Sequence, residues 1–152
     1  VTIGGASVGD HDLVGSVAAE LGLERAFYKI AMRPGKPLMA GHLAGSAMLG
    51  LPGNPVSAMV CGQLFMLPMI QKMLGLPTEA PVLQSAPLTA PLSANGRREH
   101  FMRARLTPKG IAAFDRQDSS LLTVLADANA LIVRPVDDPA RPVGEAVSYL
   151  PI

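Results

Sequence analysis

The spacing of apolar residues divides the chain into two stretches. Along residues 1–77, short apolar runs alternate with segments whose apolar positions recur at helical spacing, which is typical of α/β domains. From residue 78 onward, short alternating segments are broken by proline and glycine, which indicates several short strands. We therefore predict an α/β domain over residues 1–77 and a small all-β, barrel-like domain over residues 78–152.

The first stretch is expected to contain a helix over residues 12–22. Its apolar residues would lie on one face at helical spacing: Leu13, Val14, Val17, Ala18 and Leu21. Gly22 is expected to end the helix, since glycine favours the left-handed conformation found there. Strands are expected at residues 1–3, 26–31 and 47–51.

A second, longer helix is expected to begin at Asn54 and Pro55. Asparagine is a favoured N-cap, and proline fits the first helical position because its missing N–H would have no partner there. The apolar pattern continues to Leu74. Pro68 lies inside it and is expected to kink the helix, because it removes one intrahelical hydrogen bond.

The second stretch alternates most clearly over residues 100–106. Met102 and Ala104 would lie on one face of that strand, and Arg103 on the other. Several such strands with turn residues between them predict a small barrel or sandwich. Further expected elements are strands at residues 111–114, 130–135 and 146–150, an edge strand before residue 91, and a helical insertion at residues 119–126.

Composition excludes several classes of protein. A net charge of +1 over 152 residues predicts no general attraction to nucleic acid or to a membrane surface. No run of about 18 apolar residues is present, so we expect no membrane span. The single cysteine, Cys61, excludes a disulfide framework and fits a reducing, cytoplasmic location. The first residues lack Met and a basic region, so we expect no signal peptide and interpret residues 1–3 as the end of a strand from a longer chain.

Several polar side chains are expected to have structural or solvent-exposed roles. Cys61 is predicted to be a buried helix residue, and His100 stands alone in the sequence, which is typical of structural histidines. The pairs Arg97-Arg98 and Asp137-Asp138 are expected to lie in solvated turns.

The first candidate for chemistry is the turn Gly4-Gly5-Ala6-Ser7-Val8-Gly9, between a predicted strand and a predicted helix. Glycines there let a ligand approach the backbone, and the N–H groups of a helix start favour an anion. Asp10 and Asp12 follow and would oppose an anion unless a divalent cation lies between them. A plain glycine turn with aspartate caps explains the same residues, so both interpretations stay open.

Residues 5–9 also match the G-x-S-x-G nucleophile elbow of α/β-hydrolases. That mechanism needs a carboxylate and then a histidine further along the chain. No aspartate occurs between Leu13 and Phe114, and the late pair Glu79 and His100 lies in the β-rich stretch or its linker. The pattern therefore argues against a hydrolase.

Two further loops follow predicted strands. Residues 33–37 carry Arg33 and Lys36 on a loop stiffened by two prolines, which suits a phosphate-bearing ligand but also a solvated turn. Residues 52–57 form a strand-to-helix turn that leaves Ser57 and free N–H groups for an anion. Ligands bind at the carboxyl ends of strands in open parallel sheets, so we expect the three loops to share one rim.

Taken together, these motifs resemble the molybdopterin molybdenumtransferases, the family that includes MoeA and the gephyrin E domain. Residues 4–12, 33–37 and 50–57 match in that family's order and approximate spacing, although Ile3 stands where the family usually has serine. Weaker similarity continues at residues 96–99, 103–106, 117–120 and 128–132. The resemblance implies part of a MogA-like molybdopterin-binding α/β domain, followed by a barrel-like β-clip domain that corresponds to MoeA domain IV.

The resemblance also implies a chemistry: molybdate is inserted into adenylated molybdopterin (molybdopterin-AMP), AMP is released, and Mg²⁺ assists. Asp12 would then be catalytic and hold the metal, and Asp10 would support it. Arg103 and the serines after Asp118 would reach in from the β-domain. The residues implied in substrate binding are Gly4, Gly5, Ser7, Gly9, Arg33, Lys36, Pro52, Gly53, Asn54, Pro55, Ser57, Arg103, Ser119 and Ser120.

Members of this family have at least as much chain again before the matching region. The resemblance therefore implies a piece that binds ligand poorly and does not turn over alone, a homodimer in the full-length protein, and molybdopterin adenylyltransferase as a further partner. The alternative is a non-catalytic, gephyrin-like scaffolding module that binds peptides. A pterin-binding adenylyltransferase is a third hypothesis, against which the long β-domain argues.

Overall fold

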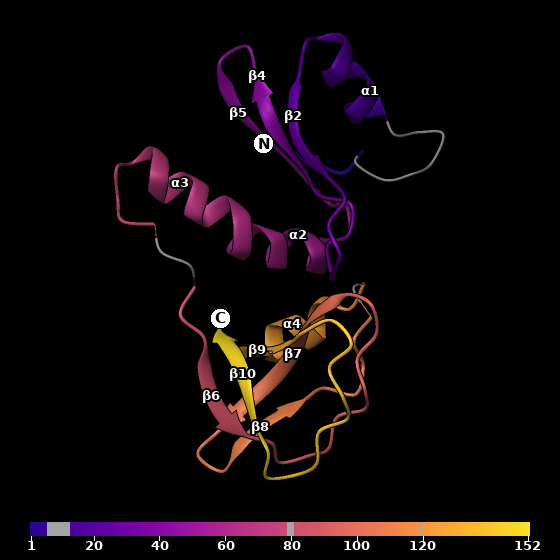
Figure 1. The fold of residues 1–152 in the computed structure, drawn as a ribbon, viewed down its shortest axis with the longest axis vertical. Helices are drawn as coiled ribbons and strands as arrows, with labels where there is room; N and C mark the ends of the chain where they lie inside the picture. Colours follow the sequence, from indigo (N-terminus) through magenta and orange to yellow (C-terminus); the bar gives the residue numbers. More distant parts are fainter. Residues whose placement is uncertain (6–12, 79–80, 119) are drawn as a thin grey trace. The chain divides into compact units, whose positions relative to one another are not determined.

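The computed structural model describes residues 1–5, 13–78, 81–118 and 120–152, and the chain divides into two compact units (Figure 1). The first unit comprises residues 1–30 and 34–78, and the second comprises residues 31–33 and 79–152. The sequence pattern had assigned residues 1–77 to one domain without interruption. Residues 31–33 differ because Met32 and Arg33 form a short strand, β3, that pairs with the second unit's sheet.

The first unit contains a four-stranded sheet with the strand order β1-β5-β4-β2. The pair β1 and β5 is parallel, whereas β4 is antiparallel to both of its neighbours. Strand β4 was not predicted, and its Gly41 lies where a Cβ would come within 2.4 Å of the Glu24 carbonyl oxygen. The strands are β1 (Thr2–Ile3), β2 (Glu24–Tyr28), β4 (Met39–Leu43) and β5 (Ser46–Leu51).

Helix α1 (Leu13–Glu20) confirms the first predicted helix over its described part. Gly22 has φ +87° and its N–H donates to the Ala19 carbonyl, so glycine ends the helix as expected. The predicted apolar face of this helix is only partly buried. Leu13 and Leu21 are exposed, and Ala18 is the one residue of α1 that is buried.

The second predicted helix consists of three consecutive pieces: α2 (Pro55–Cys61), a π-helical turn η1 (Gly62–Met66) and α3 (Leu67–Met73). The Leu67 N–H donates to the Gly62 carbonyl, five residues back. This wider turn comes just before Pro68, whose ring cannot fit against the carbonyl of an ordinary preceding α-turn. A π-turn at Gly62–Met66 thus precedes Pro68, and the kink expected at Pro68 itself stays a prediction.

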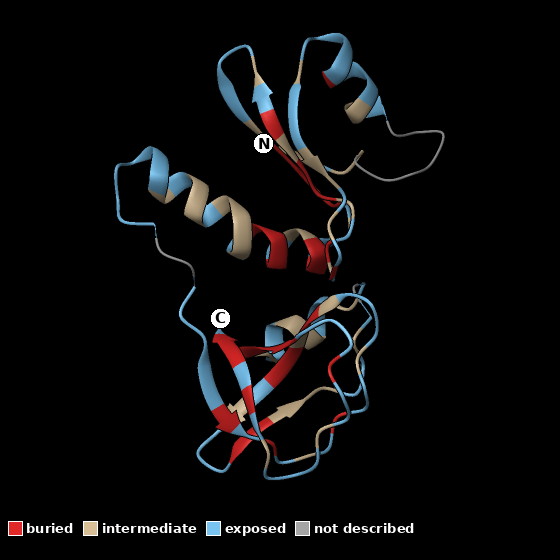
Figure 2. Ribbon diagram, in the orientation of Figure 1, coloured by how far each residue is buried: buried red, intermediate tan, exposed pale blue. Residues whose placement is uncertain are grey.

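The first unit is packed around α2 and the adjoining ends of its strands, where Figure 2 shows the buried residues. Cys61 lies fully buried in α2, as predicted, and burial raises the pKa of its thiol to about 12. The largest buried side chains of this unit are Leu38, Met39, Leu49, Leu51, Val56 and Val60.

The second unit contains a six-stranded sheet with the order β3-β7-β9-β10-β6, in which β8 pairs with β7 on the side of β3. All of its pairs are antiparallel except β3 with β7. One short helix, α4 (Leu122–Asp127), lies within the predicted helical insertion. The remaining strands are β6 (Gln84–Pro87), β7 (Glu99–Thr107), β8 (Gly110–Ala113), β9 (Ala130–Arg134) and β10 (Ala146–Pro151).

The strands of the second unit do not close into a continuous barrel in the part of the chain that is described. The two ends of the sheet are linked only where Leu88 forms a single bridge with Ile111, next to a hydrogen bond from the Thr89 N–H to the Ile111 carbonyl. The expectation of a small β-domain is confirmed, and its barrel-like character is limited to this link.

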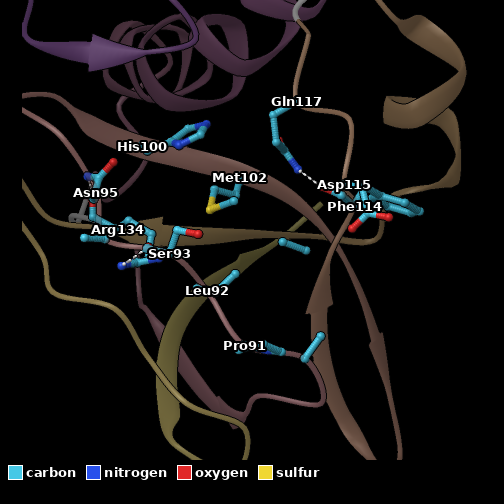
Figure 3. A pocket seen from close by; sticks show the side chains of 13 residues that line it. Pro91, Leu92, Ser93, Asn95, His100, Met102, Phe114, Asp115, Gln117 and Arg134 are labelled. Carbon is cyan, nitrogen blue, oxygen red and sulfur yellow. Dashed lines mark hydrogen bonds between the residues drawn. The ribbon is translucent and has the colours of Figure 1, made fainter.

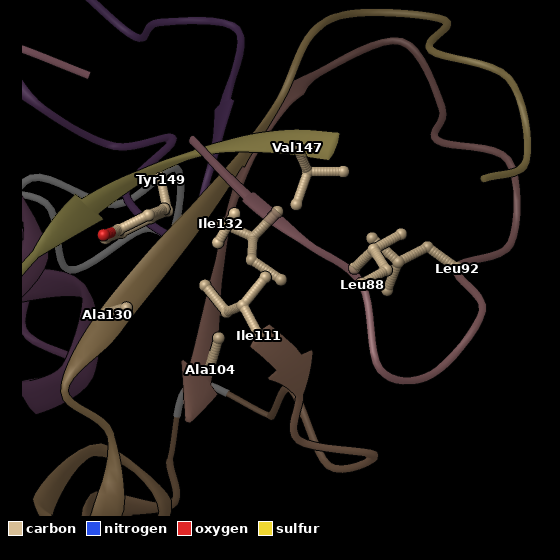
Figure 4. Packing of buried hydrophobic residues seen from close by; sticks show 9 residues of the cluster. Leu88, Leu92, Ala104, Ile111, Ala130, Ile132, Val147 and Tyr149 are labelled. Carbon is tan, nitrogen blue, oxygen red and sulfur yellow. The ribbon is translucent and has the colours of Figure 1, made fainter. Parts of the chain in front are cut away.

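An apolar cluster of buried residues lies inside the second unit (Figure 4). Ala104 of β7 belongs to it and Met102 packs against it, which confirms that these two residues share one face of that strand. The other buried members are Ala86, Leu88, Leu92, Ile111, Ala130, Ile132, Val147 and Tyr149. Among the described residues of both units, no helix has the length and apolar character needed to cross a membrane.

Candidate functional site

Two of the three predicted loops meet in the first unit. Strands β1 and β5 run parallel with Ile3 opposite Leu51, so the turns that follow them leave the sheet at the same edge. The Gly4 N–H donates to the Leu51 carbonyl at 3.0 Å. A Cβ added to Gly53 would lie 3.2 Å from the Cα of Gly4, so the two backbones touch. The shared rim is therefore present for these two loops.

Only glycine fits the first of these turns at its described end. Gly4 and Gly5 have φ +83° and +68°, a region that residues with a Cβ rarely adopt. A Cβ on Gly5 would also lie 2.4 Å from the Val14 side chain. The first turn of α1 is thereby held against the glycine turn, as the sequence predicted for a strand–turn–helix arrangement. Ser7, Gly9, Asp10 and Asp12 lie outside the described residues, and their roles stay predictions.

The second turn carries the predicted helix start. Asn54 is extended at φ −70° and ψ 124°, its side chain accepts from the Ser57 N–H at 3.5 Å, and Pro55 is the first helical residue. Ser57 is buried in the structure, with 6% of its surface exposed. Pro52 is buried as well, whereas Gly53 is exposed. Gly53, whose backbone lies beside Gly4, and Pro55 are the exposed residues of this turn.

Sequence reasoning missed one polar atom next to this rim. The Thr2 hydroxyl oxygen is buried and, among the described residues, is the one buried side-chain nitrogen or oxygen without a hydrogen-bond partner. It lies 3.4 Å from where a Cβ on Gly50 would be, so the absence of a side chain at Gly50 leaves room beside it. Thr2 lies two residues before the first motif, and nothing in its sequence position signals this environment.

The third loop is divided between the two units. Lys36 belongs to the first unit, where its carbonyl accepts from the Ile30 N–H at 3.2 Å. The Cys61 thiol lies 4.0 Å from the Gly35 carbonyl oxygen as a long hydrogen bond, which connects this loop to α2. Arg33 belongs to the second unit, opposite His100 of β7. Their joint contact with a phosphate-bearing ligand therefore stays a prediction.

Arg103 is inside the β-domain, with 2% of its surface exposed. Its guanidinium donates to the Asp118 carbonyl at 2.9 Å and to the Leu121 carbonyl at 3.4 Å. Gln117 bridges back to β7, accepting from the Arg103 N–H at 3.0 Å and donating to the Arg103 carbonyl at 2.9 Å. Arg103 thus holds the loop on which the predicted serines lie.

On that loop Ser120 is exposed and donates to Asp118 from both its backbone N–H, at 2.9 Å, and its hydroxyl, at 2.8 Å. These two hydrogen bonds lower the pKa of the Asp118 carboxyl. Ser119 lies outside the described residues. Whether either serine contacts a ligand stays a prediction, but the geometry assigns the Ser120 hydroxyl to Asp118 in this structure.

The prediction that Asp137 and Asp138 lie in a solvated turn was wrong for Asp138. Its carboxylate is buried and accepts from Arg134 and from Arg141, and these hydrogen bonds lower its pKa. Arg134, with 2% of its surface exposed, also donates to the Ser93 carbonyl at 3.1 Å and to the Pro139 carbonyl at 2.7 Å. The available signal was the placement of arginines four residues before and three residues after Asp138.

Comparison with known families bears directly on these loops. Residues 1–72 match the family described as probable molybdopterin binding domain, and residues 85–152 match the family described as MoeA C-terminal region (domain IV). The chain belongs to the molybdopterin molybdenumtransferase family. The two matches correspond to the two units of the structure apart from residues 31–33, and both converging glycine turns lie within the first match.

Relatives within the family cover nearly all of the chain. The molybdopterin molybdenumtransferase of Bacillus subtilis (strain 168) is 34% identical over 99% of this chain. Molybdopterin molybdenumtransferase 2 of Mycobacterium tuberculosis (strain ATCC 25618 / H37Rv) is 36% identical over 90% of it. The crystal structure of the molybdopterin biosynthesis MoeA protein from Pyrococcus horikosii has a TM-score of 0.77 at 27% identity, over 92% of this chain. The chain spans 36% of the length of these two curated relatives and 34% of that solved chain.

Proposed function

We propose that this chain provides part of the site at which a molybdopterin molybdenumtransferase inserts molybdate into adenylated molybdopterin and releases AMP. The observation that carries the proposal is the contact between the Gly4 and Gly53 turns at the carboxyl ends of two parallel strands. Bare backbone at such an edge admits a phosphate close to the main chain. The names of the relatives, which describe transfer of molybdenum to molybdopterin, support the same chemistry.

Within this proposal the chain's residues bind and orient the substrate. The Gly4–Gly5 turn and the Pro52–Pro55 turn approach the phosphate of molybdopterin-AMP, and Lys36 and Arg33 supply positive charge to phosphate or molybdate. Arg103 acts as a positioning residue, because its guanidinium is occupied by carbonyls of the loop that carries Ser120. Asp12, assisted by Asp10, organises the reacting groups.

Magnesium is the predicted assisting metal, and Asp12 is its predicted ligand. Among the residues that the structure describes, no three His, Cys, Asp or Glu side chains gather closely enough to hold a metal ion. Asp10 and Asp12 are outside those residues, so the described part of the chain does not supply a metal site by itself. Magnesium binding is therefore to be tested together with Asp12.

The curated relatives are about three times as long as this chain, and the proposal extends to a whole protein of that length. We propose that it works as a homodimer in the cytoplasm, with molybdopterin adenylyltransferase as the partner that supplies the adenylated substrate. Because the chain spans about a third of its relatives, its own binding is expected to be weak and without turnover. The gephyrin-like scaffolding alternative has no observation in its favour among the described contacts.

Calorimetric titration with molybdopterin-AMP, or with AMP and magnesium as a stand-in, tests the proposal. Wild-type chain is compared with Asp12→Asn and Gly53→Ala, and Gly96→Ala is the control. A Cβ on Gly53 would lie 3.2 Å from Gly4, whereas a Cβ on Gly96 meets nothing within 4 Å. We expect saturable wild-type binding, weakened about tenfold in Gly53→Ala and unchanged in Gly96→Ala.

Circular dichroism establishes that each variant is folded before the titrations are compared. A folded wild-type chain that does not bind would overturn the proposal that these two turns form a working half-site. If Gly53→Ala leaves binding intact, the phosphate is not bound at this edge of the sheet. If Asp12→Asn leaves binding intact, with and without magnesium, neither Asp12 nor the metal takes part in the site.

A further inference from the structure

The second unit contains a pocket of about 240 Å³ that none of the motifs discussed above predicts. It lies between the segment of residues 90–95 and strands β7 and β8 (Figure 3). His100 of β7 lines it and has only 8% of its surface exposed. Its imidazole has no hydrogen bond to any described residue. Among the described residues, the one fully buried side-chain nitrogen or oxygen without a partner is Thr2 Oγ1, so the His100 nitrogens keep some access to the pocket. A largely buried imidazole is thus left with free hydrogen-bonding capacity in this pocket.

The electrostatic environment of His100 is positive. Burial, followed by the charges of Arg33, Arg103, Arg134 and Arg98, lowers the pKa of His100 to about 4. The imidazole is therefore neutral near pH 7, with one nitrogen as a donor and the other as an acceptor. An anion is the ligand that such a field favours, because the same arginines that disfavour imidazolium attract negative charge.

Arg134 adds a charged donor to the same wall. It lines the pocket and directs Nε to Asp138 and Nη2 to the Ser93 and Pro139 carbonyls. Among the described residues, Nη1 makes no hydrogen bond, so the guanidinium keeps one nitrogen for a further acceptor. Its ion pair with Asp138 fixes its position before any ligand arrives.

The rest of the lining is divided between apolar side chains, among them Pro91, Leu92 and Met102, and polar ones, among them Asn95 and Asp115. Met102 lies near the centre of the view with its sulfur among the lining side chains, and Leu92 and Pro91 lie on the side away from His100 (Figure 3). Gln117 also lines the pocket, but its amide is occupied by the Arg103 and Phe114 carbonyls. A ligand with a charged end and a short apolar body matches this division.

We propose that this pocket binds a small organic oxyanion, with its charged end at His100 and Arg134 and its apolar body against Met102 and Leu92. The site is separate in its residues from the glycine turns of the first unit and does not depend on the molybdenum chemistry. Asp115, an exposed carboxylate on the lining, excludes ligands that carry negative charge at both ends.

Benzenesulfonate serves as the probe and the neutral benzenesulfonamide as its matched control, both titrated into the whole 152-residue chain. Nuclear magnetic resonance of the methionine methyl groups and the histidine rings reports the binding, and the Met102→Leu substitution assigns the Met102 signal. We expect saturable shifts at Met102 and His100 with the sulfonate and at least about tenfold weaker binding of the sulfonamide. His100→Leu is expected to weaken the sulfonate about tenfold, and the exposed His42→Leu to leave it unchanged.

The wild-type shifts make the test independent of whether His100→Leu folds. Absence of saturable shifts at Met102 and His100 would overturn the proposal. Equal affinity for the sulfonate and the sulfonamide would overturn the anionic character of the site. Equally tight binding of inorganic phosphate would remove the role of the apolar wall, and shifts confined to the first unit would place the ligand elsewhere.

Discussion

At the scale of single residues, His100 couples the stability of the protein to pH. Its pKa is about 4 in the folded chain, below the usual 6.5, so the unfolded chain binds more protons between these values. The stability that neutral His100 provides is therefore complete above pH 6.5 and is lost as the pH falls toward 4. Over the whole interval the loss is roughly 3 kcal/mol at most.

Urea denaturation at intervals from pH 7 to pH 4.5 measures this coupling. The wild-type free energy of unfolding is expected to fall across the interval, and the fall should be smaller in His100→Gln. His42→Gln is the control, because His42 is exposed. Parallel curves for wild type and His100→Gln would mean that other groups, such as Asp138, cause the acid sensitivity.

The neighbouring aspartates 137 and 138 differ sharply in environment, which permits a matched comparison. Removing the Asp138 carboxylate leaves the buried Arg134 guanidinium without its counter-ion. Asp138→Ala is therefore expected to lower the free energy of unfolding by about 3 kcal/mol or more. Asp137→Asn, at an exposed left-handed position that asparagine tolerates, is expected to change it by less than about 0.5 kcal/mol. Similar losses in urea denaturation would show that the ion pair is not the cause.

Cys61 offers a simple probe of packing, since it is the single cysteine of the chain. It is fully buried in α2, and burial raises the pKa of its thiol to about 12, so almost no thiolate forms near pH 8. We expect the folded chain to react with a thiol reagent such as Ellman's reagent only at the rate of unfolding. Chain denatured in guanidinium is the control, and fast reaction of folded chain would contradict the buried placement of α2.

At the scale of elements, the β7–β8 hairpin depends on a single glycine. Gly110 has φ +130°, and a Cβ there would lie 2.3 Å from the Pro87 carbonyl oxygen at the end of β6. Gly110→Ala is expected to cost about 2 kcal/mol or more, from backbone strain and displacement of this carbonyl. Gly144→Ala, at φ +87° with nothing within 4 Å, should cost about 1 kcal/mol and isolates the strain alone. If urea denaturation gives equal losses of unfolding free energy for the two variants, the contact with β6 does not contribute to the effect of Gly110→Ala.

The elements themselves were predicted best where residue type limits the backbone directly. Asn54 and Pro55 marked a helix start and Gly22 a helix end, because capping and positive φ depend on local chemistry. Strand β4 escaped prediction because Gly41 is required by its close contact with β2, a non-local cause. Pro68 indicated that the long helix would be disturbed, but the π-turn before it was not predicted.

The candidate site shows the same limit. The contact of the Gly4 and Gly53 turns followed from the rule that loops after parallel strands share an edge, once β1 and β5 were paired. The burial of Asp138 and the pocket at His100 could not be predicted in the same way. Both depend on segments far apart in sequence, as when Ser93 accepts from Arg134, forty-one residues later.

At the scale of the whole molecule, the two units differ in how well they cover their apolar side chains. Most of the large apolar side chains that are exposed belong to the first unit, and α3 presents several of them together. Exposed apolar surface of this kind promotes association. The exposed large apolar residues in this unit are Val1, Ile3, Leu13, Val17, Leu21, Met59, Leu67, Ile70, Met73, Leu74 and Leu76.

We therefore expect the 152-residue chain to associate with itself as its concentration rises, above its monomer mass of 15.9 kDa. Sedimentation velocity over a wide concentration range measures this. The double substitution Met73→Gln and Leu74→Gln, at the C-terminal end of α3 and its cap, should move the chain toward the monomer, because both side chains are largely exposed. Val82→Gln with Val143→Gln removes the same number of exposed apolar side chains from the second unit and should change little. A wild-type chain that stays monomeric throughout, or a stronger effect of the second pair, would mean that the exposed face of the first unit does not drive association.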